Sequence, residues 1–152
     1  MKFFFKKILS KLANSILKFL NIYVIYRIGH AVGDQLCMSS VIRLIQKQYP
    51  FKIIVISSFS ELFHNNPRLW RSYQVKVGYL GSKIARILRF LSGNHIENFL
   101  FTNVDTTYED YMRDHSNLLH IVEANTLHFN LDLNFDMISN EIFLTKNEIN
   151  SF

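Results

Sequence analysis

Hydrophobic residues near the amino terminus recur at the spacing of an α-helix. Between residues 3 and 20, one helical face collects Phe5, Ile8, Leu9, Leu12, Ile16, Phe19 and Leu20. The opposite face collects Lys7, Lys11 and Lys18. Because lysines interrupt the apolar stretch every few residues, it is too polar to span a bilayer. The pattern predicts a basic amphipathic helix over residues 1–20, followed by one folded region over residues 21–152.

After residue 21 the pattern changes to short apolar runs that alternate with helical periods. We expect strands at residues 22–26, 52–57, 74–80, 99–102 and 141–144. We expect helices at residues 35–48, 60–64, 83–91 and 117–129. Continuous apolar runs of this length are typical of strands buried inside a parallel sheet. The alternation therefore predicts an α/β fold with a Rossmann-like, doubly wound parallel sheet.

One loop of the predicted sheet carries candidate chemistry. Residues 27–34 (RIGHAVGD) leave the first strand and enter a helix, at the edge where open parallel sheets bind ligands. Gly29 and Gly33 permit a tight turn, and backbone amides at the start of the helix can hold an anion. Asp34 either caps that helix or presents a carboxylate at the mouth of the cleft. The glycine spacing matches neither the dinucleotide fingerprint nor the Gly-Lys-Ser/Thr phosphate loop.

The net charge of +5 is distributed unevenly along the chain. The first twenty residues contain five lysines and no acid, and residues 21–89 contain ten bases and two acids. Residues 90–152 contain two bases and ten acids. The basic front half predicts an anionic partner. No nucleic acid is expected, because the chain has no recognised nucleic-acid motif and its basic residues are not interleaved with stacking aromatics.

The amino-terminal helix has two interpretations. It either lies on an anionic membrane leaflet, with lysines on the headgroups and Phe and Leu in the boundary, or packs on its own domain or a neighbour. The single cysteine, Cys37, excludes an internal disulfide and fits a reducing compartment. The histidines lack the spacing of zinc ligands, so the sequence predicts neither a metal site nor a resident cofactor.

Residues 22–70 resemble the opening of the heptosyltransferase-like glycosyltransferases, which form glycosyltransferase family 9. The matching residues occur in the order of that family: Arg27, Gly33, Asp34, Tyr49, Pro50, Asn66 and Pro67. A His-x-x-Glu pattern beginning at His120 and the segment 141–148 resemble later parts of the same lobe. The chain departs from the family after Asp34, where the usual Thr-x-Pro is absent, and over residues 95–107, which lack a clear central strand.

The resemblance implies a role for each matching residue. Members of the family have two Rossmann-like lobes in the GT-B arrangement; the amino-terminal lobe holds the acceptor and the carboxy-terminal lobe holds the nucleotide-sugar. Asp34 would be the general base for the acceptor hydroxyl. The acceptor would be bound by Arg27, Gly29, His30, Gly33 and His120. We expect the chain to stop where the linker to the donor lobe begins, so that the nucleotide-sugar site is absent.

These observations lead to one expected function and two alternatives. The chain is expected to be the acceptor-binding half of a glycosyltransferase of lipopolysaccharide or surface glycan synthesis, on the cytoplasmic face of the membrane, and inactive alone because transfer needs both substrates in line. Its expected partners are an anionic glycan or glycolipid, the membrane surface, and a donor-lobe chain or a second copy. The alternatives are a non-catalytic remnant that binds a saccharide or partner, and a basic membrane-surface protein on an α/β scaffold.

Overall fold

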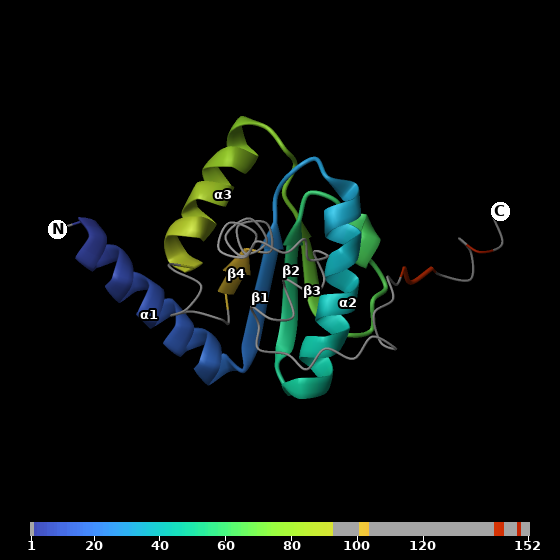
Figure 1. Ribbon diagram of the computed structural model, residues 1–152, viewed down its shortest axis with the longest axis horizontal. Helices are drawn as coiled ribbons and strands as arrows, with labels where there is room; N and C mark the ends of the chain where they lie inside the picture. The colour runs from blue at the N-terminus through green and yellow to red at the C-terminus, as the bar shows by residue number, and fades with distance from the viewer. Residues whose placement is uncertain (1, 93–100, 104–141, 145–148, 150–152) are drawn as a thin grey trace, which may run out of the picture.

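The computed structural model describes residues 2–92, 101–103, 142–144 and 149. Its elements are α1 (Lys2–Leu20), β1 (Ile22–Arg27), α2 (Val32–Gln48), β2 (Lys52–Ser57), the 3-10 turn η1 (Ser60–Phe63), β3 (Leu69–Gln74), α3 (Tyr79–Ser92) and β4 (Phe101–Asn103). The strands form one sheet in the order β3-β2-β1-β4, with every pair parallel. Helices lie on both faces of the sheet (Figure 1). The predicted α/β class is therefore confirmed, and the arrangement is compatible with a Rossmann-like core.

The register of the central strands brings their carboxyl ends to one edge. β1 and β2 pair from Ile22 opposite Lys52 to Arg27 opposite Ser57, so the two strands begin and end together. The chain proceeds outward from β1 to β2 and β3, and then returns to the other side of β1, where β4 pairs. This reversal makes the carboxyl end of β1 the topological switch point of the sheet, which is where such folds bind ligands.

The face of the sheet covered by α2 holds the main core. Successive side chains of a strand point to opposite faces, and Tyr23 and Ile25 of β1 point to this one. The helix contributes the buried side chains Met38, Val41, Ile42, Leu44 and Ile45. Each such burial stabilises the fold by about 1.5–3 kcal/mol relative to an exposed side chain. Hydrophobic burial therefore fixes α2 against β1 and β2.

The opposite face is covered by α1 and α3, which contact each other (Figure 1). Ile22, Val24 and Tyr26 of β1 are buried on this side. Leu17 of α1 packs against them, together with two leucines of α3, Leu88 and Leu91. Only part of each helix is needed for this contact, so α1 and α3 form a second helical layer with fewer buried residues than α2.

In the middle of the chain one predicted strand was wrong, and one predicted helix was confirmed with an earlier start. The predicted strand at 74–80 is not a strand: β3 ends at Gln74, and α3 begins at Tyr79 instead of residue 83. Gly78 has φ of 143°, a backbone conformation that side-chain-bearing residues rarely adopt, and it ends the extended segment. A Cβ on Gly81 would lie 2.2 Å from the backbone oxygen of Lys76, so the chain turns back on itself here.

The other predicted elements had mixed outcomes. The strand at 52–57 is confirmed, the first strand extends one residue further to Arg27, and the predicted helix at 60–64 is the 3-10 turn η1. The strand predicted at 99–102 is observed as β4, Phe101–Asn103. Residues 142–144 form no strand. The carbonyl of Phe143 instead accepts a bond from Asn65 Nδ2 at 3.5 Å, and the Arg68 guanidinium lies 5.4 Å from its ring. The helix predicted at 117–129 lies outside the described residues.

Candidate functional site at the carboxyl edge of the sheet

The segment between β1 and α2 has the predicted strand–bend–helix form. The bend occupies residues 28–31, and α2 begins at Val32, three residues earlier than predicted. The N-cap position is occupied by Ala31 without a side-chain hydrogen bond, so the backbone of Asp34 lies at the third position of the helix and Asp34 is not the N-cap residue. The first amides of a helix have no acceptor within the helix and carry its positive dipole end. This helix start can therefore attract an anion.

A buried cation lies directly beneath the bend. Arg27, the last residue of β1, is 6% exposed. Its guanidinium carbon lies 3.9 Å from the position that a Cβ on Gly29 would occupy. Arginine is rarely buried to this extent. Its electrostatic interactions with other charges are stronger where water is excluded. The charge of Arg27 and the dipole of α2 therefore both add positive potential at the bend.

The outer side of the bend is open. His30 and Gly33 are both exposed. A Cβ added to Gly33 would meet no heavy atom within 4 Å, so no packing contact requires a glycine at this position. The absence of a side chain leaves the backbone amides of the first helical turn accessible to a ligand.

A buried glutamine ties the bend to the end of β2. The side chain of Gln35 is fully buried, and its Nε2 donates to the carbonyl of Gly29 at 3.2 Å. Its Oε1 accepts a short hydrogen bond from Ser57 Oγ, which in turn accepts from the Phe59 amide at 2.9 Å. A buried amide left without partners would cost about 1–3 kcal/mol. These bonds therefore hold the bend and the strand end in one arrangement.

A second set of bonds connects the bend to β3. Ser58 Oγ accepts from the Gly29 amide at 3.1 Å, and the Ser58 amide donates to the Arg27 carbonyl at 3.3 Å. The side chain of Gln74, at the end of β3, donates to the Ser58 carbonyl at 3.4 Å and to Glu61 Oε2 at 3.2 Å. Three strand ends are thus joined by polar contacts, with Gly29 held from both its amide and its carbonyl.

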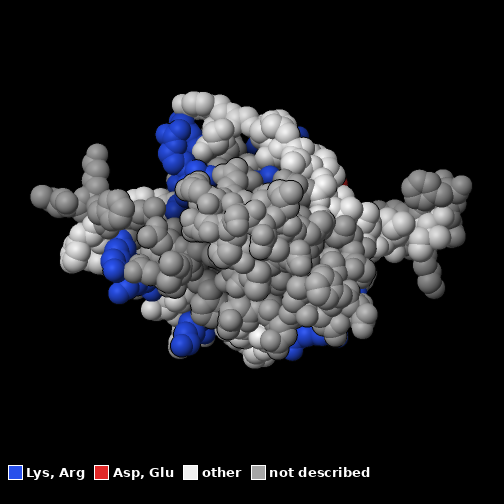
Figure 2. Space-filling model, viewed as in Figure 1, with Lys and Arg blue, Asp and Glu red and all other residues white. Residues whose placement is uncertain are grey.

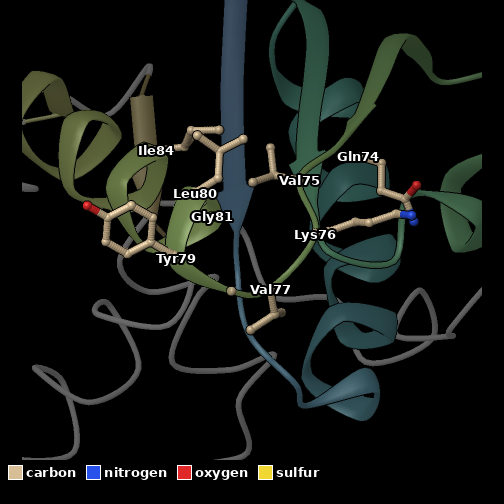
Figure 3. A pocket seen from close by; sticks show the side chains of 9 residues that line it. Gln74, Val75, Lys76, Val77, Tyr79, Leu80, Gly81 and Ile84 are labelled. Carbon is tan, nitrogen blue, oxygen red and sulfur yellow. The ribbon is translucent and has the colours of Figure 1, made fainter.

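A hollow of about 420 Å³ follows the end of β3. Its lining consists of Gln74, Val75, Lys76, Val77, Gly78, Tyr79, Leu80, Gly81 and Ile84. Figure 3 shows Val75, Leu80 and Ile84 gathered on the side of the hollow nearest β1, while Gln74 and Lys76 extend away from it. The hollow is thus mainly apolar and adjoins the electropositive bend. The pair suits a ligand that has both an anionic group and a less polar part.

The structure brings together most of the residues that the sequence singled out. Arg27, Gly29, His30 and Gly33 lie in the bend or at its two ends. Asp34 follows in the first turn of α2, and His120 lies outside the described residues. The sequence did not predict the polar residues that support the bend: Gln35, Ser57, Ser58 and Gln74. A signal exists for Ser57, Ser58 and Gln74, because polar residues at the end of an apolar strand lie at the edge where ligands bind.

The described part of the chain contains neither a cluster of metal ligands nor a membrane-spanning helix. No group of three or more His, Cys, Asp or Glu side chains among these residues is arranged to hold a metal ion. None of the described helices combines the length and the apolar character needed to cross a membrane. The site is therefore characterised by its polar framework, its electropositive bend and the adjoining hollow.

Three features make up this candidate site. The combination consists of a buried arginine under a glycine, a bend held by a buried glutamine, and an open helix start at the switch point of a parallel sheet. No protein-family model, curated protein or solved structure matches this chain.

Proposed function

We propose that this chain is the acceptor-binding lobe of a glycosyltransferase of the heptosyltransferase-like type, one of the two lobes of a GT-B fold. The supporting observation is the electropositive bend at the switch point, with Arg27 buried beneath Gly29 and an open start of α2 beyond it. Open α/β sheets bind ligands at this position, and positive potential selects an anionic ligand. The resemblance of residues 22–70 to this family supplies the substrate class: a phosphate- or carboxylate-bearing saccharide of lipopolysaccharide or another surface glycan.

In this proposal some residues of the bend bind the acceptor and another takes part in the transfer reaction. The amides of the first turn of α2 bind the anionic group of the acceptor, and Arg27 favours that group through its charge. His30 and His120 hydrogen-bond the saccharide. A sugar hydroxyl is a poor nucleophile at neutral pH. Asp34 removes the hydroxyl proton as the hydroxyl oxygen bonds to the donor sugar and the bond from that sugar to the departing nucleoside diphosphate breaks. The nucleotide-sugar is held by the second lobe, because transfer requires both substrates in line.

The proposed location is the inner face of the cytoplasmic membrane, where a glycolipid acceptor is anchored. Lys7, Lys11 and Lys18 of α1 are exposed and carry positive charge, and apolar side chains of the same helix, including Leu12 and Phe19, are also exposed. This combination is typical of helices that rest on an anionic leaflet. A donor-lobe chain or a second copy of this chain would complete the enzyme.

Binding can be tested with deacylated lipopolysaccharide core oligosaccharide, phosphorylated and dephosphorylated, by isothermal titration calorimetry. We expect the phosphorylated form to bind and the dephosphorylated form to bind roughly tenfold or more weakly, since a hydrogen bond to a charged group contributes about 1.5–3 kcal/mol. His30→Ala should weaken binding, and because His30 is exposed the variant should fold normally. An exposed histidine away from the bend, His64, supplies the matched control His64→Ala. Equal binding of both oligosaccharides, or no binding, would contradict the proposal.

Transfer can be tested separately with nucleoside-diphosphate sugars, using the chain together with the donor lobe. Asp34→Asn should keep oligosaccharide binding and abolish transfer, because the amide cannot accept the proton. Binding by the unsubstituted protein without transfer to any acceptor would instead favour the non-catalytic saccharide-binding alternative.

A further inference from the structure

Helix α1 turns its apolar face away from the rest of the protein. Its contact with the sheet side is made by a face between the apolar residues and the lysines, where Ser10 is buried and Leu17 packs against β1. The exposed large apolar side chains of α1 are Phe4, Phe5, Ile8, Leu12, Ile16, Phe19 and Leu20, with Phe19 89% exposed. Folded proteins seldom leave so many neighbouring apolar side chains in water without a binding partner.

Helix α3 shows the same arrangement, which its sequence pattern alone does not reveal. Leu88 and Leu91 pack towards the sheet, while Leu80 and Ile87 are 69% and 58% exposed. Its outward side also carries Tyr79, Phe90, Lys83, Arg86 and Arg89. The Lys83 ammonium lies 4.2 Å from the centre of the Tyr79 ring. Apolar and cationic side chains are thus interleaved on the outside of α3.

The outward sides of the two helices form one surface, here called the α1–α3 surface. It consists of the exposed apolar residues of both helices named above except Leu80, whose side chain points towards β1 (Figure 3), with Lys7, Lys11, Lys18, Lys83, Arg86 and Arg89. The helices contact each other over the same face of the sheet. Residues 1–33 and 62–96 contain no acidic residue, so every charged residue of this surface is a lysine or an arginine. Figure 2 shows Lys and Arg side chains on the left of the molecule, the side where Figure 1 places α1 and α3.

We propose that α3 is a second membrane-contacting helix, and that the α1–α3 surface lies flat on an anionic lipid leaflet. The proposal rests on the peripheral location proposed above and extends it from one helix to two. The apolar side chains enter the boundary between headgroups and acyl chains, and the lysines and arginines contact the lipid phosphates. A protein partner fits this surface less well, because the cores of protein interfaces are depleted in lysine and in charge generally.

Two membrane-contacting helices fix the orientation of the protein on the leaflet. With α1 alone in contact, the protein could rotate about the axis of that helix. Tyr79 belongs both to the α1–α3 surface and to the lining of the hollow beside β3 (Figure 3). The hollow therefore opens at the level of the lipid headgroups. A saccharide attached to a lipid in the same leaflet could reach the carboxyl edge of the sheet without leaving the membrane.

Flotation with two kinds of vesicle tests the surface: phosphatidylcholine alone, and phosphatidylcholine mixed with phosphatidylglycerol. The protein should bind the mixed vesicles and lose most binding in high salt, because headgroup attraction is screened. Ile87→Gln should lower the partition coefficient roughly five- to tenfold, from the apolar area it removes from the boundary. Ile142→Gln is the matched control, since Ile142 is 53% exposed and precedes Phe143, whose ring contacts Arg68. Figure 1 shows the segment 142–144, in red, on the opposite side of the molecule from α3. It should bind as the unsubstituted protein does.

A fluorescence measurement gives a readout that does not depend on loss of binding. An environment-sensitive fluorophore on Ile87→Cys, in a Cys37→Ser background, should shift to shorter wavelength with mixed vesicles, and the same label on Ile142→Cys should not. If neither Ile87→Gln nor the label responds while Leu12→Gln weakens binding, α3 does not touch the membrane, the proposal is overturned and the peripheral location through α1 stands. If Ile87→Gln instead converts a dimer to a monomer at unchanged vesicle binding, the surface joins two copies and the proposal is likewise overturned. Oligosaccharide binding by Ile87→Gln should be unchanged, so this test can fail independently of the proposed acceptor site.

Discussion

The two helical layers of the sheet use their hydrophobic residues in opposite ways. On one face, α2 directs Met38, Val41, Ile42 and Ile45 into a closed core, each at most 1% exposed. On the other face, α1 directs most of its large apolar side chains outward and contacts the protein through a face that includes a buried serine, Ser10. Both helices are amphipathic segments of similar length, 17 and 19 residues. The difference shows that amphipathicity defines a stripe on a helix but not the medium that the stripe faces.

The difference has a local physical cause. The face of β1 that meets α2 presents Tyr23 and Ile25 next to Ile53 and Val55 of β2. Together these side chains offer enough apolar area to bury the whole apolar face of α2. The other face is shared between two helices, and Leu17, Leu88 and Leu91 already cover it. Little of that face remains for the stripe of α1, so the stripe is left available for another apolar medium.

The largest expected effect comes from shortening equivalent isoleucines in the two layers. Ile42→Ala in α2 should lower the free energy of unfolding by about 2–5 kcal/mol, because it leaves a cavity in a closed core. Ile8→Ala in α1 should change it by less than about 0.5 kcal/mol, because Ile8 is 47% exposed. Urea unfolding followed by circular dichroism measures both. A large loss for Ile8→Ala would show that the outward face of α1 is covered in solution, and would break the comparison.

Substitution of glycines at the starts of α3 and α2 should give opposite signs. Gly81→Ala should destabilise the protein by about 1–3 kcal/mol, because the new Cβ would collide with the Lys76 carbonyl. Gly33→Ala should stabilise it by about 0.4–1 kcal/mol, because the added methyl meets open space and alanine loses less entropy in a helix. Thermal unfolding distinguishes the two. If Gly33→Ala also weakens binding of the phosphorylated oligosaccharide, the glycine is retained for ligand approach.

The smallest expected effects on stability come from substituting a buried and an exposed serine. Ser57→Ala should cost about 1–2 kcal/mol, because the buried oxygen of Gln35 loses its donor. Ser15→Ala in α1 should be neutral or slightly stabilising, because Ser15 only donates to the Lys11 carbonyl within the exposed helix at 2.9 Å. Chemical unfolding gives both values. An equally small effect at Ser57 would indicate that the bend does not depend on its link to β2.

Sequence reasoning located the parts of the fold that local patterns specify. β2 was predicted with its observed bounds because Lys52–Ser57 is a β-branched apolar run with a polar residue at each end. The bend after β1 was predicted because glycines follow a buried strand. The strand predicted over 74–80 was wrong because Val75 and Val77 alternate as in a strand, whereas β3 ends at Gln74 and the chain turns at Gly78 into α3.

By itself, then, the sequence determined the α/β class, the central strands, the position of the bend and the amphipathic character of α1, since these depend on residues close together in the chain. Tertiary structure decided that Gln35 bonds to Gly29 and Ser57, that Arg27 lies beneath the bend, and that the apolar stripe of α1 faces outward. The reason is physical. A hydrogen bond between residues 22 positions apart depends on which segments pack side by side on the sheet. The exposure of a helical face depends on how much apolar area those segments leave uncovered.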